Sequence, residues 1–231
     1  MIFRSLASSS AGNAYMVSDG DTTLMLECGM SYRKLQSKAA YMLQTVSACF
    51  VTHHHADHAA AAGPLIKHGI PVYMSEGAAR VLDLQEAEIV DPGETVRIGA
   101  FRILPFRVWH DCPQPVGYLI DDTRTRERLL FAADTRNLDV APVGLTHIAV
   151  ECNYDEQQLA ASTRINDKLR ERIRHTHMEV GDCIRYLHKL DLSRCLHIYL
   201  IHLSDHHSDA QGWEHRFRRE FPGIDIQICP K

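Results

Sequence analysis

The chain has 231 residues and a formal net charge of −4 at pH 7, with 45% hydrophobic and 23% charged residues. This composition excludes a disordered chain, and no apolar run reaches the roughly 18 residues that a membrane helix needs. The weak negative charge gives no global electrostatic reason for nucleic-acid binding, although local basic patches or metal ions can still bind phosphates.

The period of the apolar residues predicts strands and helices along the first part of the chain. The predicted strands are residues 15–17, 23–26, 48–51 and 71–74. The predicted helices are residues 32–44, 59–68 and 76–84, the second of them ended by Gly69. The strand at 48–51 is apolar and leads directly into a run of histidines.

The second part of the chain repeats this alternation. Its predicted strands are residues 95–98, 101–106, 117–121, 128–132, 148–151, 195–203 and 224–228. Its predicted helices are residues 159–175, 180–190 and 211–220. Because no linker, low-complexity tract or fixed-period repeat interrupts the chain, we expect a single domain over residues 1–231. Two sets of strands with helices outside them predict an α/β fold, a four-layer αββα sandwich.

The cysteines indicate the redox environment. There are seven, an odd number, and they are scattered without a C-x-x-C pair. A disulfide framework or a zinc ribbon is therefore not expected. The amino terminus lacks the apolar segment of a signal peptide. These features predict reduced thiols in a cytoplasmic protein.

Histidine is the unusual residue, with fifteen in the chain and a cluster at His53-His54-His55-Ala56-Asp57-His58. If the backbone turns after the strand, His53 and His55 point into one site, whereas His54 points away. Asp57 and His58 supply a second set of ligands. Imidazole nitrogen and carboxylate oxygen suit Zn²⁺, Mn²⁺ or Fe²⁺ better than Ca²⁺ or Mg²⁺.

A hydrolytic site with two metal ions also needs ligands from outside the cluster. His110, Asp134 and His202 follow predicted strands and are candidates. The alternatives are a core histidine at 110, an Asp134 that caps a turn, and a solvent-exposed histidine loop with adventitious metal affinity. An adventitious loop predicts no particular order of Asp among the histidines, whereas the order here is His-x-His-x-Asp-His.

This pattern resembles the signature of the metallo-β-lactamase superfamily. Four further segments are similar to its motifs: the stretch 24–29 with Glu27 in place of the usual Asp, His110-Asp111, the stretch 131–135, and the stretch 201–208. The serine-rich stretch 8–13 resembles the YycJ/WalJ-like branch, which is related to tRNase Z. The resemblance implies the four-layer αββα fold of metallo-β-lactamase type over nearly the whole chain.

The resemblance also implies a ligand set. One metal ion would be held by His53, His55 and His110. The other would be held by Asp57, His58 and His202, with Asp134 bridging the two ions. Two divalent ions are expected, Zn²⁺ first and Mn²⁺ or Fe²⁺ as alternatives, and a hydroxide between them would be the nucleophile.

Glu151 and His177 lie at positions that resemble those of a Glu–His pair in tRNase Z-like enzymes, where the histidine protonates the leaving oxygen. Together with Asp57 they are the expected catalytic residues. The alternative is a strand-end surface acid and a helix-terminal histidine without a catalytic role.

Substrate contacts are expected from Ser9, Asn13, Ser204 and His206, whose side chains can donate to phosphate oxygens. The basic stretch 164–174 either follows a nucleic-acid backbone or forms an ordinary ion-paired helix surface. Both interpretations stay open at this point.

The function that the resemblance implies is hydrolysis of phosphodiesters by a metal-dependent DNA nuclease, exonuclease-like in action. A phosphodiesterase for small or cyclic nucleotides is the near alternative. A thioesterase or lactonase, or a metal-binding protein without catalysis, is less favoured. The expected partner is a nucleic-acid or nucleotide substrate, with no membrane and a possible homodimer.

Overall fold

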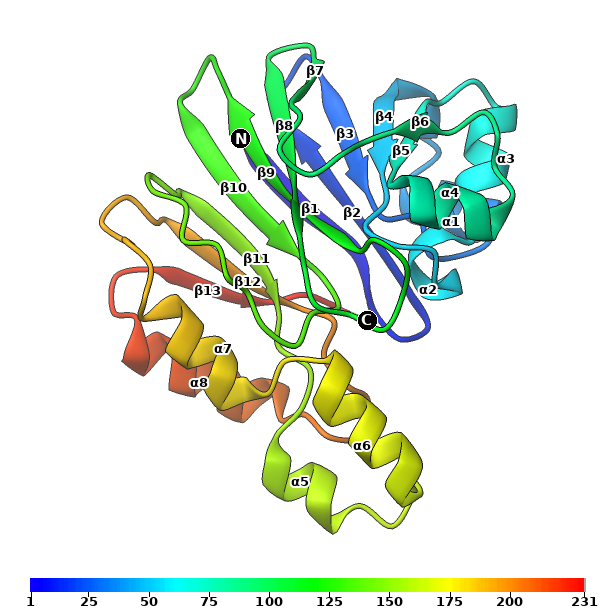
Figure 1. Ribbon diagram of the computed structural model, residues 1–231. Coiled ribbons are helices and arrows are strands. Elements are labelled where there is room, and N and C mark those ends of the chain that lie inside the picture. Colours follow the sequence, from blue (N-terminus) through cyan, green and yellow to red (C-terminus); the bar gives the residue numbers. More distant parts are fainter. Residues whose placement is uncertain (231) are drawn as a thin grey trace. The chain divides into compact units, whose positions relative to one another are not determined.

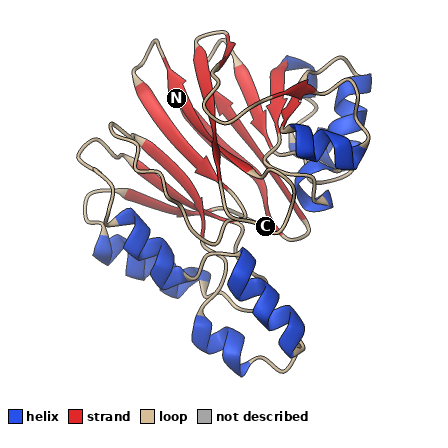
Figure 2. Cartoon of the chain, in the orientation of Figure 1, coloured by secondary structure: helices blue, strands red, loops and turns tan. Residues whose placement is uncertain are grey.

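The computed structural model describes residues 1–230, which form a mixed α/β fold (Figures 1 and 2). Contacts divide the chain into two compact units. The first unit comprises Met1–Arg107, Cys112–Glu127 and Pro230, and the second comprises Val108–Asp111 and Arg128–Cys229. The strands belong to two sheets. No helix within residues 1–230 has the length and apolar character needed to cross a membrane.

The first unit contains a six-stranded sheet in the order β1-β2-β3-β4-β5-β6. Its strands are β1 (Ile2–Ser9), β2 (Gly12–Ser18), β3 (Thr23–Leu26), β4 (Val46–Phe50), β5 (Val72–Met74) and β6 (Glu88–Ile89). β1, β2 and β3 pair antiparallel, whereas β3 to β6 pair parallel. The strands β7 (Val96–Ile98), β8 (Phe101–Arg107) and β9 (Val116–Asp122) form an antiparallel meander.

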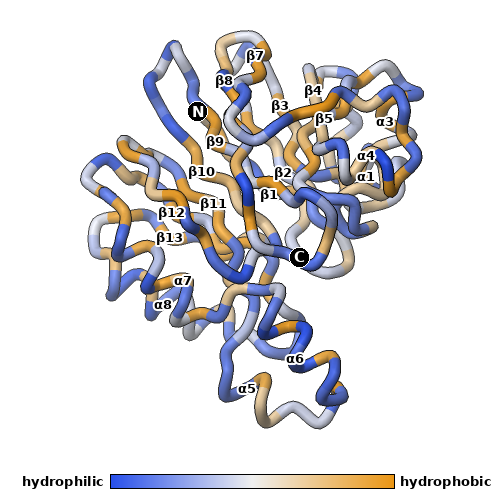
Figure 3. The backbone as a smooth tube through the Cα atoms, viewed as in Figure 1, coloured by the Kyte–Doolittle hydropathy of each residue, from blue (hydrophilic) through white to orange (hydrophobic). Residues whose placement is uncertain are grey.

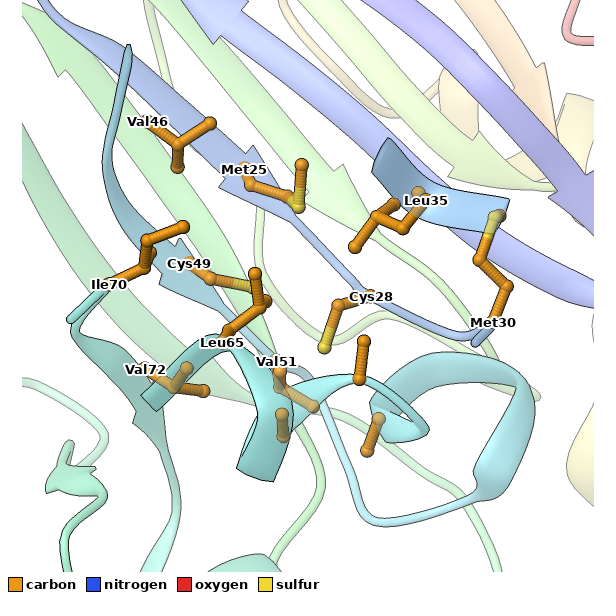
Figure 4. Close-up of a cluster of buried hydrophobic side chains, with 14 of the residues drawn as sticks. Met25, Cys28, Met30, Leu35, Val46, Cys49, Val51, Leu65, Ile70 and Val72 are labelled. Carbon is orange, nitrogen blue, oxygen red and sulfur yellow. The ribbon is translucent and has the colours of Figure 1, made fainter. Parts of the chain in front are cut away.

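The helices of the first unit are α1 (Tyr32–Lys38), α2 (Ala56–Ala59), α3 (Ala62–Lys67) and α4 (Glu76–Leu82), with a 3₁₀ turn at Leu43–Thr45. Ser31 and Ser75 cap α1 and α4 by accepting a backbone N–H of the first turn. Buried side chains of α1 and α3 pack with those of β3 to β5, for example Leu35, Leu65 and Met25 (Figure 4). This apolar core supports the end of β4, from which the histidine cluster begins.

The second unit contains four parallel strands in the order β13-β12-β11-β10. They are β10 (Glu127–Ala132, whose first residue belongs to the first unit), β11 (His147–Glu151), β12 (His197–Ile201) and β13 (Asp225–Ile228). Every residue of β11 is buried, and Figure 3 shows β11 and β12 largely in hydrophobic colours. Such continuous burial is typical of parallel strands covered on both faces. Because the carboxyl ends of parallel strands meet at one edge, residues that follow β10, β11 and β12 lie close together.

The helices of the second unit are α5 (Glu156–Ala161), α6 (Asp167–Thr176), α7 (Val180–Leu187) and α8 (Ala210–Glu220). Each begins after a side chain that accepts a backbone N–H of the first turn, from Asp155, Asn166, Glu179 and Asp209 respectively. α7 and α8 bury apolar side chains, whereas α5 and α6 are mostly exposed.

Three predicted helices are wrong in extent. The helix expected at 159–175 is two helices, because Ser162 is extended and the Asn166 side chain starts a new helix. The helix expected at 32–44 ends at Lys38, since Ala40 and Tyr41 have positive φ. The helix expected at 59–68 is divided into α2 and α3, and its end at Gly69 is confirmed by the left-handed backbone there.

The sequence analysis missed β1 and β6, because β1 shows no regular alternation and β6 is only two exposed residues long. The remaining strands lie where they are predicted, with bounds shifted by at most three residues. The mixed α/β fold with two sheets is confirmed. The single domain over residues 1–231 stays a prediction.

Candidate metal centre

The histidine loop of the first unit follows β4 and gathers four predicted ligands. His53 Nε2 lies 3.0 Å from His55 Nδ1, and the rings of His53 and His58 are 4.2 Å apart. His58 Nε2 lies 3.4 Å from Asp57 Oδ2. His53 and His58 are buried, whereas the Asp57 side chain keeps 25% exposure. The loop therefore presents three imidazoles and one carboxylate within a small volume, a donor set that suits Zn²⁺, Mn²⁺ or Fe²⁺.

Glu27 orients this loop through contacts with Thr52 and His58. It is fully buried at the end of β3 and accepts hydrogen bonds from the Thr52 backbone N–H (3.2 Å) and the Thr52 hydroxyl (2.5 Å). Its Oε1 also lies 3.3 Å from His58 Nδ1, and the Thr52 hydroxyl lies 2.9 Å from His53 Nδ1. These contacts place oxygen atoms beside the Nδ1 atoms of both histidines, an arrangement that suits binding of a metal ion through Nε2.

Asn13 and Gly29 fix the other side of the loop. The Asn13 amide donates to the carbonyl oxygens of Asp57 and Ser9, both at 3.1 Å, and lies 3.2 Å from His58 Nε2. A side chain at Gly29 would meet the Asp57 carbonyl at 1.6 Å, so only glycine permits this close approach. Asn13 and Ser9 are buried, and these contacts assign Asn13 to holding the loop. Contact of Ser9 and Asn13 with the substrate stays a prediction.

In the second unit, Asp134, His202 and His110 converge. Asp134 follows β10 and His202 follows β12, and their nearest side-chain atoms are 2.8 Å apart. His110 Nε2 lies 3.6 Å from Asp134 Oδ2. The Thr176 carbonyl oxygen, 3.0 Å from His110 Nδ1, accepts a hydrogen bond from the N–H of that nitrogen, which leaves Nε2 as the ligand atom.

Backbone strain marks these strand ends. Glu27, Asp134 and His202 have φ values of 62°, 41° and 53°, in the left-handed region that non-glycine residues rarely occupy. Each is the residue after a strand, or the second residue after it, and each carries a predicted or observed site contact. Such strain persists where the surrounding structure over-determines it, as in a pre-organised binding site.

The buried Glu151 pairs with the half-buried His177 beside these ligands. Glu151 Oε1 lies 2.5 Å from His177 Nδ1 and 3.1 Å from His202 Nδ1. Its Oε2 accepts the backbone N–H groups of Thr135 (2.8 Å) and Met178 (3.2 Å). One ligand-type atom from each of Asp134, Glu151, His177 and His202 lies within 4.8 Å of the others. The second unit by itself therefore gathers an acidic and imidazole-rich pocket suited to a divalent cation.

Charge coupling sets the protonation states of this pair. Burial raises the pKa of Glu151, but the charge and hydrogen bond of His177 outweigh burial, and the pKa lies below its ordinary value. Burial lowers the pKa of His177, but the Glu151 carboxylate outweighs it and raises the pKa above its ordinary value. The pair therefore favours a carboxylate and an imidazolium.

The remaining substrate candidates lie after β12. The Ser204 hydroxyl accepts from the backbone N–H groups of His206 and His207, and the Arg164 guanidinium lies 3.0 Å from His206 Nδ1. Burial, together with the charges of His206, Arg170 and Arg164, lowers the pKa of His207. Whether this segment contacts substrate stays a prediction.

The basic stretch on α6 is ion-paired. Arg170 pairs with Asp167, Arg172 pairs with Asp111 at 2.7 Å, and Arg174 pairs with Glu156 and Glu171. Of the two open interpretations, the geometry favours an ion-paired helix surface over a track for a nucleic-acid backbone.

The sequence analysis missed several residues that position the ligands. Thr52 and Thr135 stand next to predicted ligands, so their adjacency was an available signal. The Asn153 amide donates to the His202 carbonyl oxygen at 2.8 Å. Asn153 follows β11 by two residues, but nothing in the sequence connects it with residue 202.

Comparison with solved structures agrees with this architecture. The metallo-β-lactamase fold protein YhfI of Bacillus subtilis superposes with a TM-score of 0.77 and 17% identity, over 99% of this chain and 96% of that chain. The human tRNase Z short form superposes with a TM-score of 0.68 and 14% identity, over 100% and 97%. These likenesses show the fold, and they confirm the metallo-β-lactamase type predicted from the sequence.

Sequence relatives agree as well. The exodeoxyribonuclease WalJ of Streptococcus pneumoniae is 27% identical, over 86% of this chain and 80% of that protein. The exodeoxyribonuclease YycJ of Bacillus anthracis is 26% identical, over 87% and 82%. Residues 22–203 match the family described as the β-lactamase superfamily domain. With its His/Asp cluster suited to divalent metal ions and more than half of its length inside this match, the chain belongs to the β-lactamase superfamily.

Proposed function

We propose that this chain is a metal-dependent hydrolase that cleaves phosphodiester bonds and acts on DNA as an exonuclease. The observation that carries the proposal is the contact between the half-buried His177 and the buried Glu151, with 2.5 Å between Oε1 and Nδ1, where Glu151 also contacts the candidate ligand His202. A phosphodiester has an alkoxide leaving group that needs a proton, and a positioned imidazolium supplies one.

The proposed metal centre uses both predicted ligand sets. His53, His55 and His110 would hold one divalent ion, and Asp57, His58 and His202 would hold the other, with Asp134 shared. The donor chemistry in each unit supports this assignment, and Zn²⁺, Mn²⁺ and Fe²⁺ all fit it. When bound, two such ions supply an acidified water at neutral pH and neutralise charge on a phosphate.

The protein's own residues provide the rest of the chemistry. Glu27 and Thr52 hold His53 and His58 through contacts at Nδ1, so that Nε2 would be the ligand atom of each. Glu151 holds His177 through Nδ1, so that Nε2 of the imidazolium is the atom that donates to the leaving oxygen. In this scheme Asp57 is a ligand that also orients the nucleophile, and His177 is the general acid.

DNA is the proposed substrate because two relatives that span most of this chain are named exodeoxyribonucleases. A second candidate is a small or cyclic nucleotide. The net charge of −4 and the ion-paired arginines of α6 favour it, since neither feature attracts a long polyanion.

A direct assay tests the proposal. The protein loaded with Mn²⁺ or Zn²⁺ is incubated with end-labelled single- and double-stranded DNA, with cyclic nucleotides and with a thioester. We expect stepwise shortening of DNA from an end, and loss of this activity in His177→Ala at unchanged metal content. Turnover of the thioester alone, or no turnover of any phosphodiester with either metal, would contradict the proposal.

Two further features of the proposal concern the protein's setting. None of the seven cysteines, all within residues 1–230, forms a disulfide, which supports a reducing compartment, and we propose the cytoplasm. A homodimer is also proposed, and light scattering of the purified protein measures its mass against the 26.2 kDa of one chain.

A further inference from the structure

We propose that Trp109 is a stacking platform for a nucleobase of the substrate, so that the site recognises a base as well as a phosphate. The inference rests on the proposed phosphodiesterase function and names the part of the substrate that the second unit binds. It starts from a cavity of about 590 Å³ in the second unit. Its lining includes Trp109, His110, Arg136, Asn137, Asp139 and His175.

Trp109 is exposed but held in place. Its side chain is 61% exposed, although tryptophan is normally a highly buried residue. The indole Nε1–H donates to Asp139 Oδ2 at 2.6 Å. The Trp109 backbone N–H donates to the Thr135 hydroxyl at 3.0 Å, and its carbonyl accepts the Arg136 N–H at 2.9 Å. A large aromatic face is therefore presented to solvent with little rotational freedom left to lose on binding.

Trp109 lies next to candidate metal ligands. Trp109 precedes the candidate ligand His110, and both residues line the same cavity. Thr135, which anchors the Trp109 backbone, follows the candidate ligand Asp134. A base stacked on Trp109 would thus be bound beside the atoms that hold the metal ion, in the position of a nucleotide that adjoins the scissile phosphate.

The charges around the cavity permit an anionic ligand. Asp111 and Asp182 line it, but Asp111 pairs with Arg172 and Asp182 pairs with Arg185. The third acid, Asp139, accepts the indole N–H. The cationic side chain of Arg136 lines the same cavity and is exposed. Aromatic faces beside cationic side chains are the common means by which proteins bind single-stranded nucleic acid.

The two tryptophans of the chain make a direct test feasible. Trp213 is 4% exposed in α8, so an added base quenches mainly the emission of Trp109. The metal-loaded full chain is titrated with a single-stranded oligothymidylate that carries phosphorothioate linkages to slow cleavage. An abasic oligomer of equal length has the same charge but no bases. Thymidine 5′-monophosphate and a cyclic nucleotide form separate arms, which distinguish a polymer from a small nucleotide as the source of the base.

We expect quenching by oligothymidylate and none by the abasic oligomer. Fluorescence anisotropy of an end-labelled oligomer measures the affinity of the variants that lack Trp109. By this measure Trp109→Ala should weaken oligothymidylate binding roughly tenfold, and Trp109→Phe should retain most of the affinity while losing the quenching signal. Tyr41→Ala removes an aromatic side chain that is 66% exposed in the first unit, and it should bind like the unaltered chain. Quenching by mononucleotides at equal concentration would assign the base to a small nucleotide.

Some outcomes would overturn the inference. These are unchanged affinity in Trp109→Ala, an equal loss for the abasic oligomer, or quenching that persists in Trp109→Phe. The binding readout is independent of turnover. A chain that shows the quenching but cleaves no phosphodiester keeps the stacking site and loses the proposed function. If the chain cleaves DNA and Trp109→Ala binds oligothymidylate with unchanged affinity, the proposed function stands and the stacking site is contradicted.

Discussion

The two units each place a fully buried glutamate after or at the end of a strand, and the two glutamates have different surroundings. Glu27 contacts a single continuous loop, through Thr52 and His58. Glu151 contacts three separate segments, through the Thr135 and Met178 backbone and the side chains of His177 and His202. The first glutamate holds ligands that are already neighbours in the sequence, whereas the second gathers groups from different strand ends. We therefore expect Glu27 to orient metal ligands in the first unit. In the second unit we expect Glu151 to orient a ligand and also to keep His177 protonated.

The largest expected effect tests whether both units serve one centre. Asp57→Ala in the first unit and Asp134→Ala in the second should each lower phosphodiesterase kcat by about 10³-fold or more, because each removes a carboxylate that neutralises a divalent ion. Metal content by elemental analysis should fall in both variants. Full activity and full metal content in either variant would separate that unit from the centre.

The next prediction tests the proposed donation of a proton from His177 to the leaving group. His177→Ala should lower kcat on DNA by about 10²-fold or more with metal content retained. A p-nitrophenyl phosphodiester, whose leaving group needs no proton, should lose much less. An equal loss on both substrates would show that His177 does not act as the general acid.

Replacing each glutamate by glutamine compares the two units directly. Glu27→Gln should weaken metal binding by about 10- to 100-fold, the usual range for a group that orients a ligand. It should not change how strongly kcat depends on the leaving group of the substrate. Glu151→Gln should alter that dependence as well, because His177 loses its charged partner. Metal titration and two substrates of different leaving group measure both effects. Identical behaviour of the two variants would remove the distinction drawn between the glutamates.

A smaller effect concerns the packing that supports the first unit. Gly29→Ala should lower the free energy of unfolding by about 3 kcal/mol, since the added methyl overlaps the Asp57 carbonyl backbone. Gly63→Ala in α3 is the matched control, because its methyl meets only the flexible end of Leu84 at 3.3 Å. Thermal unfolding of both variants checks this, with a lower Tm expected for Gly29→Ala alone.

The smallest effect is a shift in titration. In the metal-free protein, the pKa of His177 should lie above its ordinary value of about 6.5, and Glu151→Gln should lower it. A raised folded-state pKa stabilises the fold fully below about pH 6.5, and this contribution is lost as pH rises through the raised value. NMR titration of the His177 ring measures the shift. A value at or below the ordinary one in the unaltered chain would contradict the coupling.

Much of the site could be predicted from the sequence because its chemistry is local. His53, His55, Asp57 and His58 lie within six residues after one apolar strand, so their order alone identified a ligand loop. The strands themselves follow from runs of apolar residues that the fold buries, as in β11 and β12. The C-terminal end of α1 and the break between α5 and α6 were not predicted. They depend on left-handed residues and on a cap that compete with continued helical periodicity.

Tertiary structure alone decided which residues support the ligands. Asn13 meets Asp57 across 44 positions, Asn153 meets His202 across 49, and Trp109 is fixed by Asp139 across 30. None of these pairs has a periodic signal, because a hydrogen bond between distant segments depends on where the chain has been brought by its core. The donor chemistry and the strands that carry it follow from the order of the residues along the chain. The fold determined the orientation of each donor, since orientation is set by contacts that no local pattern records.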